Sequence, residues 1–461
     1  MKRVSPNLTF IKFLAVLLII TAPLAAQSKK DRERAKNLQD QADKAFTQKN
    51  YRVAVDTYAQ SILTIPNNSY AHYRKGFAHF NLKENDQAVS EFTLALSQGF
   101  KPIEIYRIRY FVYFEQRNFD EALADIQKGL QLAPNDLNFL SAIGEIYFAR
   151  QSYLEALAAY QKASQLAPNN ADIFYNMARV YFATGDIKGQ AAAAESAIAK
   201  GTRFPGEAHY MLGDAYQKQR NVSGAIGEYQ KAINSKPDLY QAYRNLAAVY
   251  RGENRLNDAI DISKQGLKNF PNDGYFYTDL SWFYSLADRP DDAVQAAKAG
   301  ISILPSQYTA YTNLCRAYND VKNFTEAITA CNMALKLNPG DGETYFYLGR
   351  SYNLTNRSVE ATRYYGLAVT GLIAYTNKNP NDADSWYLLG NAYFADNQRD
   401  KAQDAYLKCL ALSPKFAKAR YNLGIIYTRK KDKVSANGQY TNLLPLDPKL
   451  AAALKAEIDK M

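Results

Sequence analysis

The sequence predicts an all-α solenoid built from about twelve stacked helix pairs. A proline returns every 34 residues within three runs of the chain, as from Pro134 to Pro168. A tyrosine and an alanine return in the same frame. Each repeat also contains two stretches with apolar residues three or four apart, the spacing of one face of an α-helix. One pair cannot bury both of its faces, so the pairs are expected to stack into a continuous core.

The proline marks the end of the second helix of each repeat, because the residue before a proline disfavours helical backbone. These prolines are Pro134, Pro168, Pro237, Pro271, Pro305, Pro339, Pro380, Pro414 and Pro448. The recurring tyrosines are Tyr147, Tyr181, Tyr216, Tyr250, Tyr284, Tyr318, Tyr352, Tyr393 and Tyr427. The recurring alanines are Ala156, Ala225, Ala259, Ala293, Ala327, Ala361, Ala402 and Ala436.

Small residues in the first helix let the two antiparallel helices of a pair approach closely, facing the alanine of the second helix. Gly213, Ala247 and Gly390 are examples. The tyrosine and a later aromatic residue, such as Tyr229, are expected to fill the gap between neighbouring pairs.

Three repeats depart from this pattern. The third repeat (103–136) has Tyr110 where the small residue should be, and the fifth has Gln190 in place of the alanine. The segment "GLIAYTN" (371–377) adds seven residues, close to two helical turns. It should lengthen the second helix without rotating its buried face.

The pattern resembles the tetratricopeptide repeat (TPR) over residues 35–448. The resemblance implies a right-handed superhelix that is lined inside by the first helix of each pair. The segment "KLAAALKAEIDKM" (449–461) is then expected to form a capping helix over the last core face.

The N-terminus is typical of a secretory signal peptide over residues 1–26, followed by a short basic segment, 27–34. It combines a basic start, an apolar run and small residues before Gln27. We therefore expect an exported protein, in the periplasm or outside a bacterial cell. An uncleaved N-terminal helix acting as a membrane anchor is the alternative. Beyond residue 26 no apolar run approaches the roughly 20 residues that span a bilayer.

Charge and motifs argue against several classes of function. The formal charge is +11, of which Lys2, Arg3 and Lys12 belong to the leader, leaving 11 − 3 = +8. This mild excess does not indicate nucleic-acid binding. The histidines His72, His79 and His209 fall on packing positions, and no second ligand stands at metal spacing. Without phosphate-loop or nucleophile motifs, we expect no catalytic residues, no metal and no cofactor.

Two of the three cysteines face each other inside the ninth repeat. Cys315 takes the small position and Cys331 the later aromatic position. A disulfide between them suits an oxidising compartment, and two buried thiols remain an equal alternative. Cys409 has no partner and should be a buried free thiol.

Residues next to the small position should point into the concave face of a TPR superhelix, where the helix-pair core does not require them. Asparagine, aromatic and arginine side chains recur there. The candidate partner-binding residues are Tyr175, Asn176, Arg179, Tyr210, Asp214, Arg244, Asn245, Trp282, Asn313, Arg316, Phe346, Arg350, Tyr387, Asn391, Tyr421 and Asn422. Residues 240–370 form the best candidate stretch for partner binding. The alternative is that asparagine and tyrosine are simply common at the polar positions of such helices.

The resemblance implies a non-enzymatic scaffold that binds a protein or peptide along its concave groove, in assembly of an envelope or secretion complex. A carbohydrate-associated adaptor is the alternative. The last repeat is basic, which a solvated capping surface explains, with contact to a polysaccharide or anionic surface as the other interpretation. Its basic residues are Lys415, Lys418, Arg420, Arg429, Lys430, Lys431 and Lys433.

Overall fold

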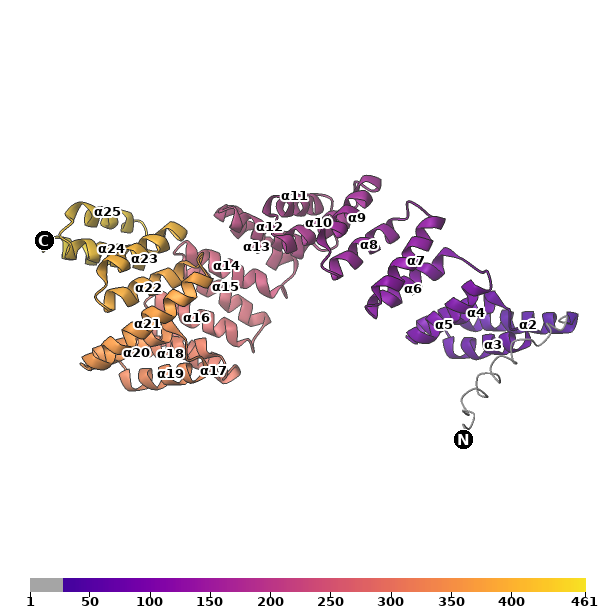
Figure 1. Ribbon diagram of the computed structural model, residues 1–461, viewed down its shortest axis with the longest axis horizontal. Helices are drawn as coiled ribbons and strands as arrows, with labels where there is room; N and C mark the ends of the chain where they lie inside the picture. Colours follow the sequence, from indigo (N-terminus) through magenta and orange to yellow (C-terminus); the bar gives the residue numbers. More distant parts are fainter. Residues whose placement is uncertain (1–27) are drawn as a thin grey trace, which may run out of the picture. The chain divides into compact units, whose positions relative to one another are not determined.

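The computed structural model describes residues 28–461, which form twelve helix pairs and a final helix (Figure 1). No strand occurs among these residues. The predicted all-α solenoid is therefore confirmed. The leader expected over residues 1–26 lies outside the described residues.

The chain divides after Pro168 into two compact units. The first contains four helix pairs: α2 (Lys29–Thr47), α3 (Tyr51–Thr64), α4 (Ser69–Asn81), α5 (Asn85–Ser97), α6 (Ile103–Glu115), α7 (Phe119–Leu132), α8 (Leu137–Ala149) and α9 (Tyr153–Leu166). Because α2 begins at Lys29, most of the segment expected as a separate basic stretch belongs to the first helix.

The second unit contains eight helix pairs and the final helix. They are α10 (Ala171–Thr184), α11 (Ile187–Ala199), α12 (Pro205–Lys218), α13 (Val222–Ser235), α14 (Tyr240–Gly252), α15 (Leu256–Asn269), α16 (Gly274–Leu286), α17 (Pro290–Ile303), α18 (Tyr308–Asp320), α19 (Phe324–Leu337), α20 (Gly342–Leu354), α21 (Ser358–Lys378), α22 (Ala383–Ala395), α23 (Arg399–Leu412), α24 (Ala417–Arg429), α25 (Lys433–Leu443) and α26 (Pro448–Ile458). In α26, Leu454 packs against Gly424 of α24.

The turn inside every pair contains one residue with left-handed backbone. In the fifth pair it is Gly185, with φ 77°. In the other eleven it is a larger residue, with φ between 58° and 63°: Lys49, Lys83, Arg117, Gln151, Arg220, Asn254, Asp288, Lys322, Asn356, Asn397 and Lys431. A residue with left-handed backbone ends a helix sharply. For a residue other than glycine, this conformation costs about 1 kcal/mol of conformational free energy. The repeated turn gives each pair the same geometry.

The small position of a repeat lies beneath the later aromatic ring of the same pair. A Cβ atom added to Gly213 would sit 2.8 Å from the ring of Tyr229, and one added to Gly390 would sit 2.5 Å from Tyr406. The later aromatic therefore packs inside its own pair, whereas the sequence interpretation placed it between pairs. In the third pair the sizes are exchanged: Tyr110 takes the small position, and the smaller, fully buried Ile126 takes the later aromatic position in the same core cluster.

The added segment lengthens α21 to 21 residues, against 14 for most second helices, as predicted. Gly371, the first added residue, lies against Gly342 of α20, and a Cβ on Gly371 would sit 2.8 Å from the Cα of Gly342. The two helix backbones therefore meet directly at this pair of glycines.

We expect Gly371→Ala to destabilise the second unit by about 1–3 kcal/mol, because the methyl group would overlap backbone atoms that cannot rotate away. Gly366→Ala is the matched control on the same helix, since no atom lies within 4 Å of its added Cβ. It should be neutral or stabilise by up to about 1 kcal/mol. Thermal unfolding followed by circular dichroism measures both, and equal effects would contradict the close approach.

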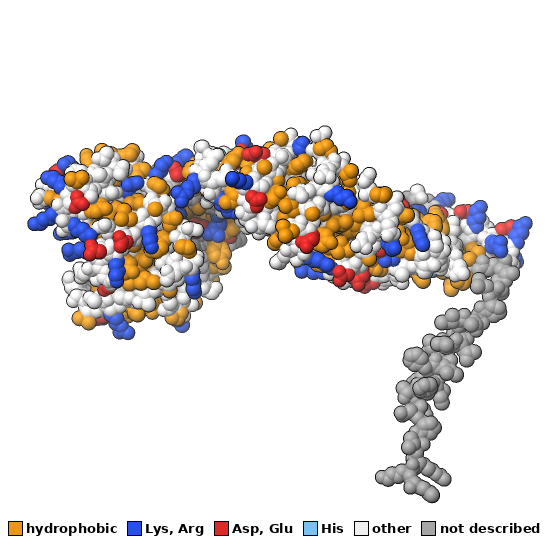
Figure 2. All heavy atoms as spheres, turned by 45° about the horizontal axis from the view of Figure 1, so that its top comes forward, with side chains coloured by type: hydrophobic (Ala, Val, Ile, Leu, Met, Phe, Trp, Pro, Cys, Tyr) orange, Lys and Arg blue, Asp and Glu red, His pale blue; other side chains and the backbone are white. Residues whose placement is uncertain are grey.

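Charged side chains are spread over the visible surface. On the face shown in Figure 2, Lys and Arg side chains are interspersed with Asp and Glu and form no continuous basic stripe. Among the described helices, none combines the length and the apolar character that a membrane span requires.

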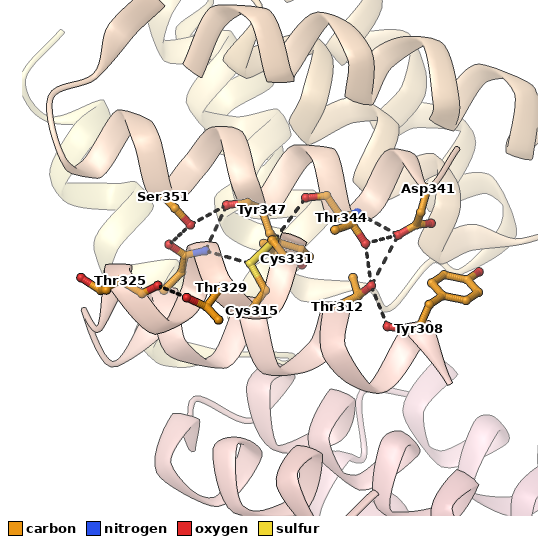
Figure 3. Close-up of a disulfide and its surroundings, with 11 residues drawn as sticks. Tyr308, Thr312, Cys315, Thr325, Thr329, Cys331, Asp341, Thr344, Tyr347 and Ser351 are labelled. Carbon is orange, nitrogen blue, oxygen red and sulfur yellow. Dashed lines mark hydrogen bonds between the residues drawn. A yellow bond between two sulfur atoms is a disulfide. The ribbon is translucent and has the colours of Figure 1, made fainter. Parts of the chain in front are cut away.

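A disulfide joins the two helices of the ninth pair (Figure 3). Cys315 of α18 and Cys331 of α19 are bonded, with Cα atoms 5.2 Å apart. A buried polar network runs beside the bond, in which Asn319 donates to the carbonyl of Tyr347 (3.1 Å) and Ser351 donates to Asn319 (2.9 Å). This network ties α18 to α20. Cys409 is buried and unpaired, as expected.

Candidate functional site

The second unit closes on itself, because side chains from its third and fourth pairs contact its last two pairs and the final helix. Arg251 forms a salt bridge with Asp384, with Nη1 and Oδ1 2.7 Å apart. Asn254 Nδ2 donates to the carbonyl of Leu446 (2.9 Å). We call these two contacts, together with those of Lys415, Lys418 and Lys449 described below, the seam. The contacting residues are 133 to 192 positions apart in the sequence.

Three lysines of the last repeat and final helix complete the seam. Lys418 Nζ donates to the carbonyl of Ser285 (3.0 Å), Lys415 pairs with Glu253, and Lys449 pairs with Asp288. Lys415 stays at the surface, with its side chain 52% exposed, whereas Lys418 is partly buried in the seam and is not part of a solvated cap. Both join the last pair of the second unit to its third and fourth pairs.

The second unit contains an open cavity of about 670 Å³ that we call the inner cavity. It is lined by the first helices of the last five pairs, α16, α18, α20, α22 and α24, with residues from α21, α23 and α26. Its aromatic lining is Trp282, Phe346, Tyr347, Tyr365, Tyr387, Phe394, Tyr406 and Tyr421. Its charged lining is Arg316, Asp320, Arg350, Lys418, Arg429 and Glu457.

Half of the sixteen candidate residues line the inner cavity. They are Trp282, Arg316, Phe346, Arg350, Tyr387, Asn391, Tyr421 and Asn422. Arg244 and Asn313 line a second cavity of about 470 Å³, which also touches Trp282. The other six line neither cavity: Tyr175, Asn176, Arg179, Tyr210, Asp214 and Asn245. The structure thus shifts the candidate stretch from residues 240–370 toward the C-terminus.

The asparagine amides expected to hold a peptide backbone are largely engaged within the fold. Asn313 Nδ2 donates to the carbonyl of Thr278 (2.9 Å), and Asn422 Nδ2 donates to Asn391 Oδ1 (2.8 Å). Asn245 Nδ2 donates to the hydroxyl of Tyr210 (3.3 Å). These contacts link neighbouring repeats, so the asparagines position the inner helices.

Four other candidates near the start of the second unit also have partners inside it. The ring of Tyr175 stacks on Phe204 with centroids 4.6 Å apart. Arg179 Nη1 donates to Asn176 Oδ1 (3.1 Å). Asp214 is buried and accepts from the side chain of Gln190 (2.9 Å), which explains how a polar residue replaces the usual alanine there.

Trp282 lines both cavities, and Arg316 stacks on it within the lining of the inner cavity. The Arg316 guanidinium lies 3.9 Å from the centroid of the Trp282 ring. Arg316 is only 4% exposed, and its Nη2 donates to Asn313 Oδ1 (2.9 Å). Such stacking holds both side chains in place, so Trp282 presents a fixed aromatic surface to both cavities.

The second cavity is acidic, in contrast to the inner cavity. Its carboxylates are Asp279, Asp341, Glu343, Asp382 and Asp384. Burial raises the pKa of Glu343 to about 8, against the attraction of Arg316, whose Nη1 lies 3.4 Å from Oε1. Burial also raises the pKa values of Asp279, Asp341 and Asp384. The described residues contain no group of His, Cys, Asp and Glu side chains placed to hold a metal ion.

Comparison with known proteins agrees with the helix pairs. A family model described as TPR repeat matches residues 144–185 and 390–431, and one described as tetratricopeptide repeat matches residues 210–274. The matched segments of this chain are therefore TPR repeats. A TPR relative in Saccharomyces cerevisiae, small glutamine-rich tetratricopeptide repeat-containing protein 2, is 36% identical over 64 residues. That match covers 14% of this chain and only 18% of the yeast protein.

Two solved structures resemble this chain at low similarity. Yeast Tom70 is 14% identical, with 93% of this chain and 96% of that chain covered and a TM-score of 0.39. MamA is 22% identical, with 38% of this chain and 94% of that chain covered and a TM-score of 0.33.

The raised pKa of Glu343 predicts a pH-dependent stability of this TPR unit. The folded protein keeps this proton up to about pH 8, whereas the unfolded chain loses it near the ordinary value of 4.5. The folded state therefore binds more protons between these values, and the free energy of unfolding falls as pH rises through that window.

Glu343→Gln should remove this fall and stabilise the protein at pH 8 by at least about 1 kcal/mol, the equivalent of one pKa unit. Urea unfolding at pH 5 and pH 8, followed by tryptophan fluorescence, measures the difference. Glu326→Gln on the exposed face of α19 is the control and should leave the pH dependence unchanged. The same pH dependence in wild type and Glu343→Gln would contradict the assignment.

Sequence reasoning missed the residues one turn further along the inner helices of these TPR pairs. Ser285 and Asp320 line the inner cavity three and four positions after Trp282 and Arg316. Because residues three and four apart share a helix face, extending the predicted positions by one turn would have found them. Lys418 could not be found in this way, since its place depends on the closure of the seam.

Proposed function

We propose that the protein is an exported, non-enzymatic scaffold that binds a polypeptide partner in the inner cavity of its second unit. TPR proteins are generally protein-interaction scaffolds, which supports the class of partner. The observation that carries the proposal is the inner cavity, whose aromatic and charged lining faces a shared space.

The size and lining of the inner cavity suit a short segment of a partner. A volume of about 670 Å³ lies within the usual range of ligand sites, roughly 300–1,000 Å³. Tryptophan, tyrosine and arginine are the residues most often found as binding anchors. Trp282, already held by Arg316, would lose little conformational freedom when a partner binds. The proposed ligand is therefore a peptide segment and not a folded domain.

Export and a role in assembling an envelope or secretion complex are part of this proposal. They rest on the leader pattern of residues 1–26 and on the scaffold role of the family. The mass of the N-terminal peptide of the purified exported protein tests processing. A peptide beginning at residue 27 is expected, and an intact leader would contradict it in favour of an anchored protein.

A carbohydrate-associated adaptor has less support. The aromatic lining would also suit a sugar chain. However, several basic residues of the surface expected to meet a polysaccharide already form contacts within the protein. Lys415 and Lys418 belong to the seam, and Lys430 pairs with Asp400 (2.6 Å).

Selection from a phage library of random 12-residue peptides, carried out on the purified protein, tests polypeptide binding. We expect enriched peptides whose synthetic copies bind the wild type and bind Trp282→Ala at least tenfold more weakly. Trp386→Ala is the matched control, because Trp386 packs with Lys408 outside the inner cavity. Failure to enrich any peptide, or equal binding to both variants, would contradict the proposal.

A further inference from the structure

Four polar residues converge where the inner cavity opens into a neighbouring hollow of about 480 Å³. Ser285, Asp320, Arg350 and Lys418 line both spaces. They come from α16, α18, α20 and α24, so four different repeats supply them. They meet only because the seam closes the second unit. We call this place the junction.

Two buried polar atoms in the lining of the inner cavity lack hydrogen-bond partners. The Ser285 Oγ and the Arg316 Nε have none within the described chain. Ser285 is 7% exposed and Arg316 is 4% exposed, so water does not freely satisfy these atoms. Buried donors of this kind are costly unless they are paired, so an acceptor atom of a ligand would be favoured beside them.

Positive charge is in excess at the junction. Lys418 is partly buried, and within the described chain no carboxylate lies within salt-bridge distance of its amine. Burial lowers the pKa of Lys418, and the charges of Arg316 and Arg350 lower it further, while Asp320 and Asp288 oppose them. Arg350 already pairs with Asp320 (Nη1 to Oδ1, 2.9 Å). Three cations thus lie near one another beside two carboxylates, of which Asp320 pairs with Arg350 and Asp288 pairs with Lys449.

The carboxylate beside Arg316 does not balance this excess. Glu343 stays largely protonated at neutral pH, because burial raises its pKa to about 8. Lys418 donates one hydrogen bond, to the carbonyl of Ser285, and an ammonium group has two further donors. An incoming anion would accept from Lys418 and from the unpaired Ser285 hydroxyl.

We infer that the junction binds a carboxylate of the polypeptide ligand, with Lys418 and Ser285 as donors and Arg316 and Arg350 supplying the attracting charge. The inference rests on the proposed function and names the chemistry of its ligand: an acidic segment whose neighbouring apolar side chains contact Trp282 and the tyrosines. The carboxylate comes from an Asp or Glu side chain or from a chain terminus, because both present the same two oxygens.

The test uses synthetic 12-residue peptides, each selected for binding to the wild-type protein. Every peptide is made in four forms: acidic or with Asp and Glu replaced by Asn and Gln, each with a free or an amidated C-terminus. The protein has two tryptophans, so Trp386→Phe leaves Trp282 as the sole fluorescent reporter in the cavity. Fluorescence titration in this background gives the dissociation constants.

We expect at least a tenfold loss of affinity when the carboxylate is neutralised. Loss on amidation alone assigns a terminal carboxylate, and loss on side-chain replacement assigns Asp or Glu. Lys418→Met should bind acidic and neutral forms equally, because it keeps the length of the side chain and removes its charge. Lys336→Met, on the exposed face of α19, is the matched control and should keep the tenfold preference.

Equal affinity of acidic and neutral forms for the wild type would overturn the inference while leaving polypeptide binding intact. An undiminished acidic preference in Lys418→Met would also overturn it, and Arg350→Gln provides a second variant should Lys418→Met unfold. If no peptide binds the wild type, the proposed function and the inference both fail.

Discussion

Tyr284→Ala should destabilise the second unit by about 3–5 kcal/mol, as truncation of large core aromatics does. Tyr284 is buried in α16 among the pairs of the second unit, and the Arg289 guanidinium lies 4.6 Å from its ring centroid. Removal of the ring leaves a cavity and uncovers this cation. Urea unfolding followed by circular dichroism measures the loss.

Trp282→Ala on the same helix is the comparison, because Trp282 is only half-buried and lines the two cavities. We expect it to cost less than half as much stability as Tyr284→Ala and to weaken peptide binding by roughly 2 kcal/mol, as for a binding anchor. If Trp282→Ala unfolds the protein as badly as Tyr284→Ala, the tryptophan is a core residue and its assignment to the cavity wall is wrong.

Loss of the Cys315–Cys331 disulfide should cost about 3 kcal/mol, the loop-closure value for cysteines 16 residues apart. The double variant Cys315→Ala, Cys331→Ala tests this without leaving polar thiols in the core. The eighth pair shows that small residues are tolerated there, since Ser281 and Ala297 occupy the corresponding positions, 315 − 34 and 331 − 34, and are fully buried.

Reduction by dithiothreitol should lower the unfolding midpoint of the wild type and leave that of the double variant unchanged. Cys409 should resist alkylation until the protein unfolds, because it is fully buried and burial raises the pKa of its thiol. A midpoint that does not respond to reductant in the wild type would show that the two cysteines do not stabilise the pair.

The helix pairs could be predicted from the sequence because their determinants are local and repeat. The alanine of each second helix, such as Ala225, is fully buried, and the added residues 371–377 extend α21 as their number of helical turns predicts. Direct contact between Gly342 and Gly371 could not be predicted in this way, since it depends on how two helices cross.

The candidate site could be predicted only in part, for a physical reason. Neighbouring repeats fix which residues face inward, and this placed Trp282, Arg350 and Tyr387 at the inner cavity. The small rotation from each repeat to the next accumulates over several pairs, and it decides which distant repeats meet. The contact of Lys418 with Ser285, 133 residues apart, depends on that sum.

Site-specific photocrosslinking in cells that produce the protein tests polypeptide binding in the inner cavity most directly. Benzoylphenylalanine replaces Phe394, which lines the cavity and is 36% exposed, or Val359, which is 80% exposed and lines none of the cavities described above. The account predicts a crosslinked polypeptide from position 394 and none from position 359. Adducts from position 359 alone, or none from position 394, would contradict it.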